Sequence, residues 1–229
     1  MATIDAASMA AIFKAYDVRG TVPEQLDESV VERIGAAFAR FVADTDGASS
    51  VLLAHDMRPS GPAFADAFAR GATVQGLDVI MLGLASTDLL FFAAGRFDMP
   101  GAMITASHNP AQYNGAKLCL SGARPIGADT GLTQIRDMTV SGLPTVATPG
   151  AVSSRSDALD LFVEHVHSFI DVDRMRPMRV VADAANGMGG LTAPAVFAGM
   201  PVELDMLYGE LDGPFPNHPA DPLLPENLR

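Results

Sequence analysis

The chain has 229 residues, of which 48% are apolar and 18% charged, a composition typical of globular rather than disordered proteins. Its formal net charge of −12 repels nucleic acid and anionic membranes, which argues against both as main partners. The single cysteine, Cys119, excludes an internal disulfide and a cysteine-rich zinc site. Because the N-terminus lacks the pattern of a secretory signal and the apolar runs are too short to span a bilayer, we expect a cytoplasmic protein.

Helix and strand patterns alternate through the first part of the chain. Apolar residues with helical spacing predict four helices, over residues 27–42, 60–76, 87–95 and 129–138. Short apolar runs between them predict four strands, over residues 51–54, 78–82, 102–105 and 117–120. This alternation indicates an α/β domain with a mixed, largely parallel sheet and flanking helices.

A second unit of similar type follows a segment of different composition. Residues 141–155 contain two prolines, two glycines and several Ser and Thr, and this composition predicts a linker. Beyond it, helix and strand patterns alternate over residues 157–170, 179–184, 191–198 and 202–207. We therefore expect a first domain over 1–145 and an incomplete second domain over 155–229. The thin core of the second unit and a tail without a clear element indicate a truncated protein.

The best candidate for chemistry follows the strand predicted over 102–105. Ser107 and His108 come directly after it, where ligands bind in open α/β sheets, so Ser107 could serve as a nucleophile or phosphate carrier. The Asn-Gly pair at 114–115 predicts a turn that returns Lys117 to the same rim, where it could hold a phosphate or take a proton. These residues alone leave a structural role open, because Ser at a strand end commonly caps or forms a turn.

Two further residues, Asp56 and Arg58, follow the strand at 51–54. They either brace the serine loop or pair with each other at a surface. We favour a role in the structure of the protein rather than in its chemistry. The Gly187-x-Gly189 string resembles part of a dinucleotide fingerprint, but Thr192 stands where a third glycine would be needed. We interpret that string as a tight strand-to-helix turn.

Several ordered strings resemble the α-D-phosphohexomutase family, in its phosphomannomutase/phosphoglucomutase branch. The segment that carries the active-site serine in that family is matched by TASHNP at 105–110 followed by YNGAK at 113–117. Four further segments agree in order: FKAYDVRG at 13–20, AHDMRPSG at 54–61, DAANGMGG at 183–190, and FPNH at 215–218 through PENL at 225–228. The resemblance covers almost the whole chain, from residue 12 to its end.

The resemblance implies that Ser107 is phosphorylated and transfers its phosphoryl group to a hexose phosphate, through a hexose 1,6-bisphosphate. It implies Lys117 or His108 as general base or acid, and Tyr16, Arg19 and Asn109 as residues that bind substrate or phosphate. Mg²⁺ would bind one oxygen of the phosphate on Ser107. The Asp-rich metal loop of the family is absent from these 229 residues, so we expect the remaining ligands elsewhere and the chain alone to be inactive.

Other readings stay open within this resemblance. Tyr113 before Asn-Gly favours the phosphomannomutase/phosphoglucomutase branch over phosphoglucosamine mutase, though only moderately. From another functional class, the chain could be a non-catalytic module that keeps a phosphate pocket without the metal site. Neither the preferred sugar nor the oligomeric state follows from the sequence.

Overall fold

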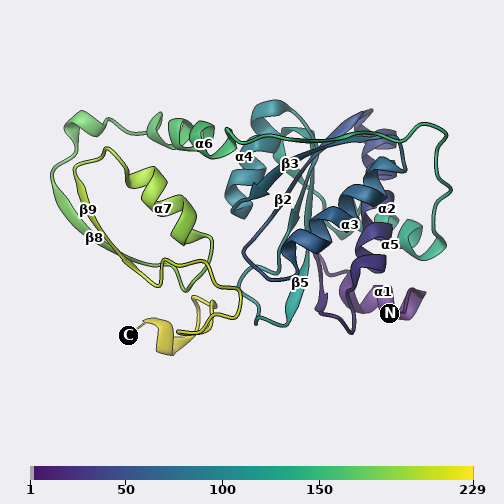
Figure 1. Cartoon of the computed structure of the whole chain (residues 1–229), viewed down its shortest axis with the longest axis horizontal. Helices are drawn as coiled ribbons and strands as arrows, with labels where there is room; N and C mark the ends of the chain where they lie inside the picture. Colours follow the sequence, from purple (N-terminus) through teal and green to yellow (C-terminus); the bar gives the residue numbers. More distant parts are fainter. Residues whose placement is uncertain (1–2, 229) are drawn as a thin grey trace.

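The structure is a computed structural model that describes residues 3–228, so residues 1, 2 and 229 at the ends of the two expected domains lie outside it. It forms a large α/β unit followed by a smaller one, which lie side by side (Figure 1). The predicted α/β class, with a mixed and largely parallel sheet and flanking helices, is confirmed.

The large unit is built on one seven-stranded sheet. Its strands are β1 (Val18–Thr21), β2 (Ser50–His55), β3 (Asp78–Leu84), β4 (Gly101–Ile104), β5 (Tyr113–Leu120), β6 (Arg124–Pro125) and β7 (Val152–Ser154). They lie in the order β1-β5-β4-β2-β3-β7, with β6 beside β5. The pairs β4–β2, β2–β3 and β3–β7 are parallel, whereas β5 is antiparallel to β1, β4 and β6.

Helices cover both faces of this sheet. They are α1 (Ala6–Ile12), α2 (Glu28–Asp46), α3 (Gly61–Thr73), α4 (Thr87–Phe97) and α5 (Leu132–Ser141). The first three and α5 share one apolar core, while α4 packs on the opposite face with the start of α6 (Ala158–His167) (Figure 1). Asp27 caps α2 by accepting a hydrogen bond from the N–H of Val30. Ser60 precedes α3 but makes no side-chain cap.

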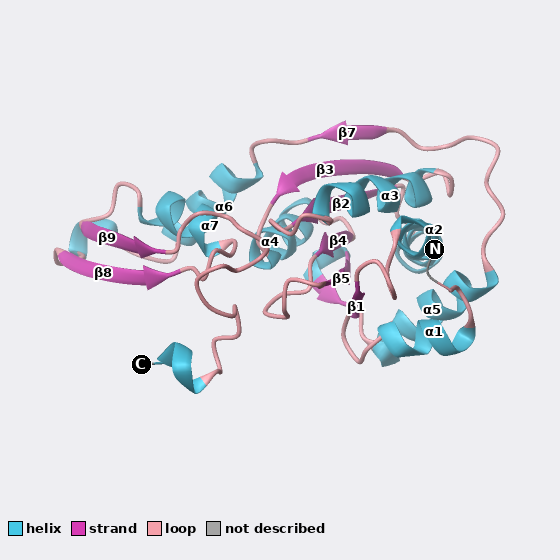
Figure 2. Cartoon of the chain, turned by 60° about the horizontal axis from the view of Figure 1, so that its bottom comes forward, coloured by secondary structure: helices cyan, strands magenta, loops and turns pink. Residues whose placement is uncertain are grey.

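Several short elements of the large unit were not predicted from the sequence. The helix α1 and the strands β1 and β6 were not predicted, since each is short and lacks a clear period. Asn114 and Gly115, predicted as a turn, lie inside β5, because pairing with β1 overrides the local preference of Asn-Gly. The expected linker contributes β7, which pairs with β3 at the edge of the sheet (Figure 2).

The small unit follows the predicted alternation. Helix α6 (Ala158–His167) leads to β8 (Met178–Asp183), α7 (Gly189–Phe197) and β9 (Val202–Leu207), and β8 and β9 are parallel. The Gly187–Gly189 turn joins β8 to α7, as interpreted from the sequence. Short 3₁₀ turns occur at Ser121–Ala123, Ala128–Thr130, Val172–Arg174 and Pro225–Leu228. Among the described residues, no helix combines the length and apolar character that a membrane span requires.

The helices α2 and α3 approach each other through two glycines. A Cβ on Gly71 would lie 1.9 Å from the carbonyl oxygen of Glu32, and one on Gly35 would lie 2.3 Å from that of Phe68. Neither backbone can give way cheaply, so only glycine permits this distance between the helices.

We therefore expect Gly71→Ala to lower the free energy of unfolding by about 1–3 kcal/mol or more, through overpacking. Gly95→Ala in α4 is the control, since its new Cβ would lie 3.6 Å from the nearest atom, an ordinary contact. The control should stabilise the protein by about 0.5–1 kcal/mol through helix propensity. Equal effects of the two changes in urea denaturation would contradict this packing.

Candidate functional site

The Ser107 loop, residues 105–112, connects β4 to β5. Ser107 is exposed and has φ 54°, in the left-handed region that few L-residues adopt. Its N–H donates to the hydroxyl oxygen of Thr105 at 2.9 Å, and that hydroxyl donates to the carboxylate of buried Asp56 at 2.5 Å. The hydroxyl of Ser107 is thus presented by a backbone that is anchored to the end of β2.

A buried guanidinium holds the rest of this loop. The side chain of Arg58 is 1% exposed and donates four hydrogen bonds of 2.7–2.9 Å to backbone carbonyls. The acceptors are the carbonyl oxygens of Ser107, Asn109, Pro110 and Tyr113. Of the two readings left open for this arginine, bracing of the serine loop is therefore confirmed.

Asp56 is the charged partner of this arginine. Its Oδ2 lies 3.3 Å from Arg58 Nε, and its Oδ1 accepts from the backbone N–H of Arg58 at 3.0 Å. The Nε contact does not have hydrogen-bond geometry, so we treat it as an ion pair only. Burial lowers the pKa of Arg58, and the Asp56 carboxylate opposes that effect. Arginine stays charged regardless, so the loop rests on a permanent cation.

Two other cations gather beside the loop on a shared carboxylate. Asp17, which is 6% exposed, accepts from Arg19 at 2.7 Å and from Lys117 at 3.2 Å. Arg19 also donates to the amide oxygen of Asn109 at 3.3 Å and so reaches the Ser107 loop itself. The structure thus brings three predicted site residues, Arg19, Asn109 and Lys117, into one network.

Strand pairing explains this convergence. Arg19 pairs with Gly115 across β1 and β5, and Lys117 pairs with Met103 across β5 and β4. Because residues two apart on a strand share a face, Arg19, Lys117 and Met103 all lie on the α4 face of the sheet. Lys117 is therefore returned to the site by the antiparallel strand β5, and the turn that we predicted at Asn-Gly is wrong.

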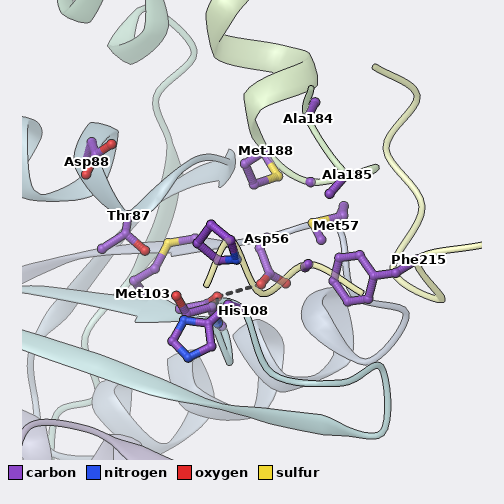
Figure 3. Close-up of a pocket in the computed structure, with 15 residues that line it drawn as sticks. Asp56, Met57, Thr87, Asp88, Met103, His108, Ala184, Ala185, Met188 and Phe215 are labelled. Carbon is purple, nitrogen blue, oxygen red and sulfur yellow. Dashed lines mark hydrogen bonds between the residues drawn. The ribbon is translucent and has the colours of Figure 1, made fainter. Parts of the chain in front are cut away.

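A cleft of about 390 Å³ opens in front of Ser107 and His108, on the same α4 face (Figure 3). Met103 lines its floor, Thr87 and Asp88 at the start of α4 line one wall, and the small unit supplies the other. The residues of the small unit are Ala184, Ala185, Gly187, Met188, Phe215, Ala220 and Pro222. The cleft thus lies between the two units, and His108 also lines a second cleft of about 670 Å³.

Not every predicted site residue joins the network of Arg19, Asn109 and Lys117 around Asp17. Tyr16 is 80% exposed and is not among the residues that line the described clefts. Sequence reasoning missed Asp17 and Thr105, although both lie inside the quoted strings. Their role depends on contacts across 100 and 49 positions of the chain, to Lys117 and Asp56, which no local pattern shows.

Cys119, the one thiol, is not a candidate nucleophile. It is buried on β5, and burial raises its pKa to about 11, so the thiolate is scarce near neutral pH.

The Thr105 hydroxyl yields a test of how the loop is held. We expect Thr105→Val to lower the free energy of unfolding by about 1–3 kcal/mol, because it leaves the Ser107 N–H and the Asp56 carboxylate without their partner. Thr105→Ser keeps the hydroxyl and should cost clearly less. If urea denaturation gave the same loss for both variants, the hydroxyl would not be the link that we describe.

Comparison with known proteins agrees with this geometry. The family model for phosphoglucomutase/phosphomannomutase, alpha/beta/alpha domain I, matches residues 10–142. A protein of Xanthomonas campestris pv. campestris named phosphohexose mutases is 39% identical over 94% of this chain and 47% of its own length. A phosphomannomutase of Salmonella typhimurium is 37% identical over 93% of this chain and 48% of its own length.

A solved structure agrees as well. The phosphoglucomutase/phosphomannomutase family protein of Burkholderia thailandensis superposes with a TM-score of 0.85 at 35% identity, over 96% of this chain and 48% of that one. The chain therefore spans about half the length of the relatives it matches. It belongs to the phosphoglucomutase/phosphomannomutase family, whose alpha/beta/alpha domain I corresponds to residues 10–142.

Proposed function

We propose that this chain carries the phosphoserine of a phosphohexomutase, an intramolecular phosphotransferase that interconverts hexose 6-phosphate and hexose 1-phosphate. The observation that carries the proposal is the exposed Ser107 hydroxyl, held at the cleft between the units with Arg19 and Lys117 beside its loop. The names of the relatives, phosphohexose mutases and phosphomannomutase, support the same substrate class.

The proposed reaction has two transfers. In the first, the bond between phosphorus and Ser107 Oγ breaks, and a new bond forms to a hydroxyl of the hexose phosphate, which becomes hexose 1,6-bisphosphate. His108, or Lys117 in its uncharged form, takes the proton of that hydroxyl. The sugar then reorients, and Ser107 Oγ attacks its other phosphoryl group. The bond between that phosphorus and the sugar oxygen breaks, and the released sugar oxygen takes back the proton held by His108 or Lys117, so that the enzyme ends as it began.

Local charge makes this chemistry possible in an acidic protein. The net charge of −12 repels a sugar phosphate at long range, whereas phosphoryl transfer needs the charge of the transferring group neutralised. Arg19 and Lys117 supply two positive charges, of which Asp17 offsets one in the structure. A phosphate on Ser107, with a charge of roughly −1.5 to −2, would compete with Asp17 for both cations.

Mg²⁺ would bind an oxygen of the phosphate on Ser107, where it would help to offset the negative charge. Within residues 3–228, no group of three or more His, Cys, Asp or Glu is placed to hold a metal ion. The Asp56 carboxylate near the loop is already engaged by Thr105 and Arg58. Apart from a phosphate on Ser107, the described residues therefore offer no such cluster of ligands for the ion.

Two alternatives predict different outcomes. A phosphoglucosamine mutase would prefer glucosamine phosphate over mannose or glucose 1-phosphate as substrate. A non-catalytic phosphate-binding module would bind hexose phosphate and leave Ser107 unmodified. The names of the relatives favour a phosphomannomutase/phosphoglucomutase over a phosphoglucosamine mutase and over a non-catalytic module.

Ser107 should carry the phosphate. In the natural full-length protein, we expect mass spectrometry to find a phosphoryl group on Ser107, and Ser107→Ala to lose most mutase activity with Mg²⁺ and hexose 1,6-bisphosphate. Exposed Ser156→Ala is the control and should keep activity. Normal turnover by the Ser107 variant would refute the assignment.

Lys117 should act on the same phosphoryl group. We expect Lys117→Ala to lower turnover by about two or more orders of magnitude, the scale of a lost acid–base or electrostatic group. Its melting temperature should barely change, since Asp17 keeps its ion pair with Arg19. Lys14→Ala removes the other lysine, which is exposed, and serves as control. A large loss of stability with normal specific activity would assign Lys117 a structural role.

A further inference from the structure

The segment Asp212–Phe215 of the small unit packs directly against Arg58, the arginine that holds the Ser107 loop. A Cβ on Gly213 would lie 2.6 Å from Pro59 Cδ and 2.9 Å from Arg58 Cα, so only a residue without a side chain fits there. This approach places the Phe215 ring 5.2 Å from Arg58 Cζ, a cation–π distance.

The ring completes the surroundings of the buried arginine. The four carbonyl acceptors engage the two terminal nitrogens of Arg58, and hydrogen bonds of a guanidinium run in its plane. Arg58 Cζ lies over the face of the Phe215 ring, so the ring adds a cation–π contact to these hydrogen bonds. Phe215 is itself 9% exposed and has φ 53°, a backbone conformation that its surroundings must stabilise.

Hydrogen bonds near both ends of this segment connect it to the turn between β8 and α7. Buried Asn186 lies in the turn after β8. Its side-chain amide donates to the carbonyl of Glu210 at 3.0 Å, and its backbone carbonyl accepts from the backbone N–H of Asp212 at 3.0 Å. Its side-chain oxygen also accepts from Asn217 at 2.7 Å. A movement of the β8–α7 turn, which lines the Ser107 cleft, must therefore move Phe215 as well.

We propose that Phe215 is a positioning residue for Ser107, which acts through Arg58 and links the placement of the small unit to the geometry of the serine loop. Arg58 holds the carbonyls of the loop, and Phe215 holds Arg58. The catalytic meaning rests on the proposed function, but the link itself is a property of the structure that can be measured without turnover.

The test is hydrogen exchange of the amides in residues 105–113, measured on the wild-type chain and on variants at position 215. Phe215→Leu keeps an apolar side chain but removes the ring, and it should speed exchange there by roughly two- to thirtyfold, the range that a cation–π contact supports. Phe215→Tyr keeps the ring face and should restore protection. Fluorinated phenylalanines at 215 keep the shape but weaken the ring quadrupole, so exchange should rise with each added fluorine.

The matched control is Phe169→Leu, which removes a ring that is 73% exposed in the small unit and lies against His165. It should leave the exchange of 105–113 unchanged. Exchange that stays at the wild-type rate in Phe215→Leu, or that does not respond to fluorination, would overturn the proposal. The phosphate on Ser107 is scored separately by mass spectrometry, so an unphosphorylated Ser107 would refute the mutase function and leave this link standing.

Discussion

One buried cation, Arg58, determines the shape of the reactive loop. A loop that exposes a serine with a left-handed backbone leaves carbonyl groups without partners in a ladder. This guanidinium satisfies three of them, together with the carbonyl of Tyr113 at the start of β5. A buried guanidinium in turn needs acceptors and a countercharge, which the loop and Asp56 supply. Each side removes the desolvation cost of the other, so neither the loop nor the arginine is stable without its partner.

The sheet gathers positive charge at one place in an acidic protein. Two antiparallel strands bring Arg19 and Lys117 to one face, and the Asp17 carboxylate pairs with both. The result is a small positive region inside a chain whose net charge is −12. The small unit forms the opposite wall of the cleft, so Ser107 lies where the two units meet.

Local sequence patterns predicted most of the helices and strands, but they predicted few of the contacts inside the candidate site. The helices at 27–42 and 87–95 and the strand at 202–207 follow from spacing and capping, which are properties of neighbouring residues. Asn114 and Gly115 were misjudged because strand pairing with β1 decided their conformation. The Ser107 loop was located by its position after a strand and by family resemblance. Its brace depends on Arg58 contacts 49 to 55 positions away, which only the folded chain displays.

The most direct measurement of this account is a crystal structure of Arg58→Met, in which an unbranched apolar side chain fills much of the same volume without any donor. We expect β2, β4 and β5 to superpose on the parent structure, while residues 107–113 lose their backbone conformation and Ser107 leaves its positive φ. A variant whose Ser107 loop kept the parent geometry, with its carbonyls satisfied in some other way, would contradict the claim that this guanidinium builds the site.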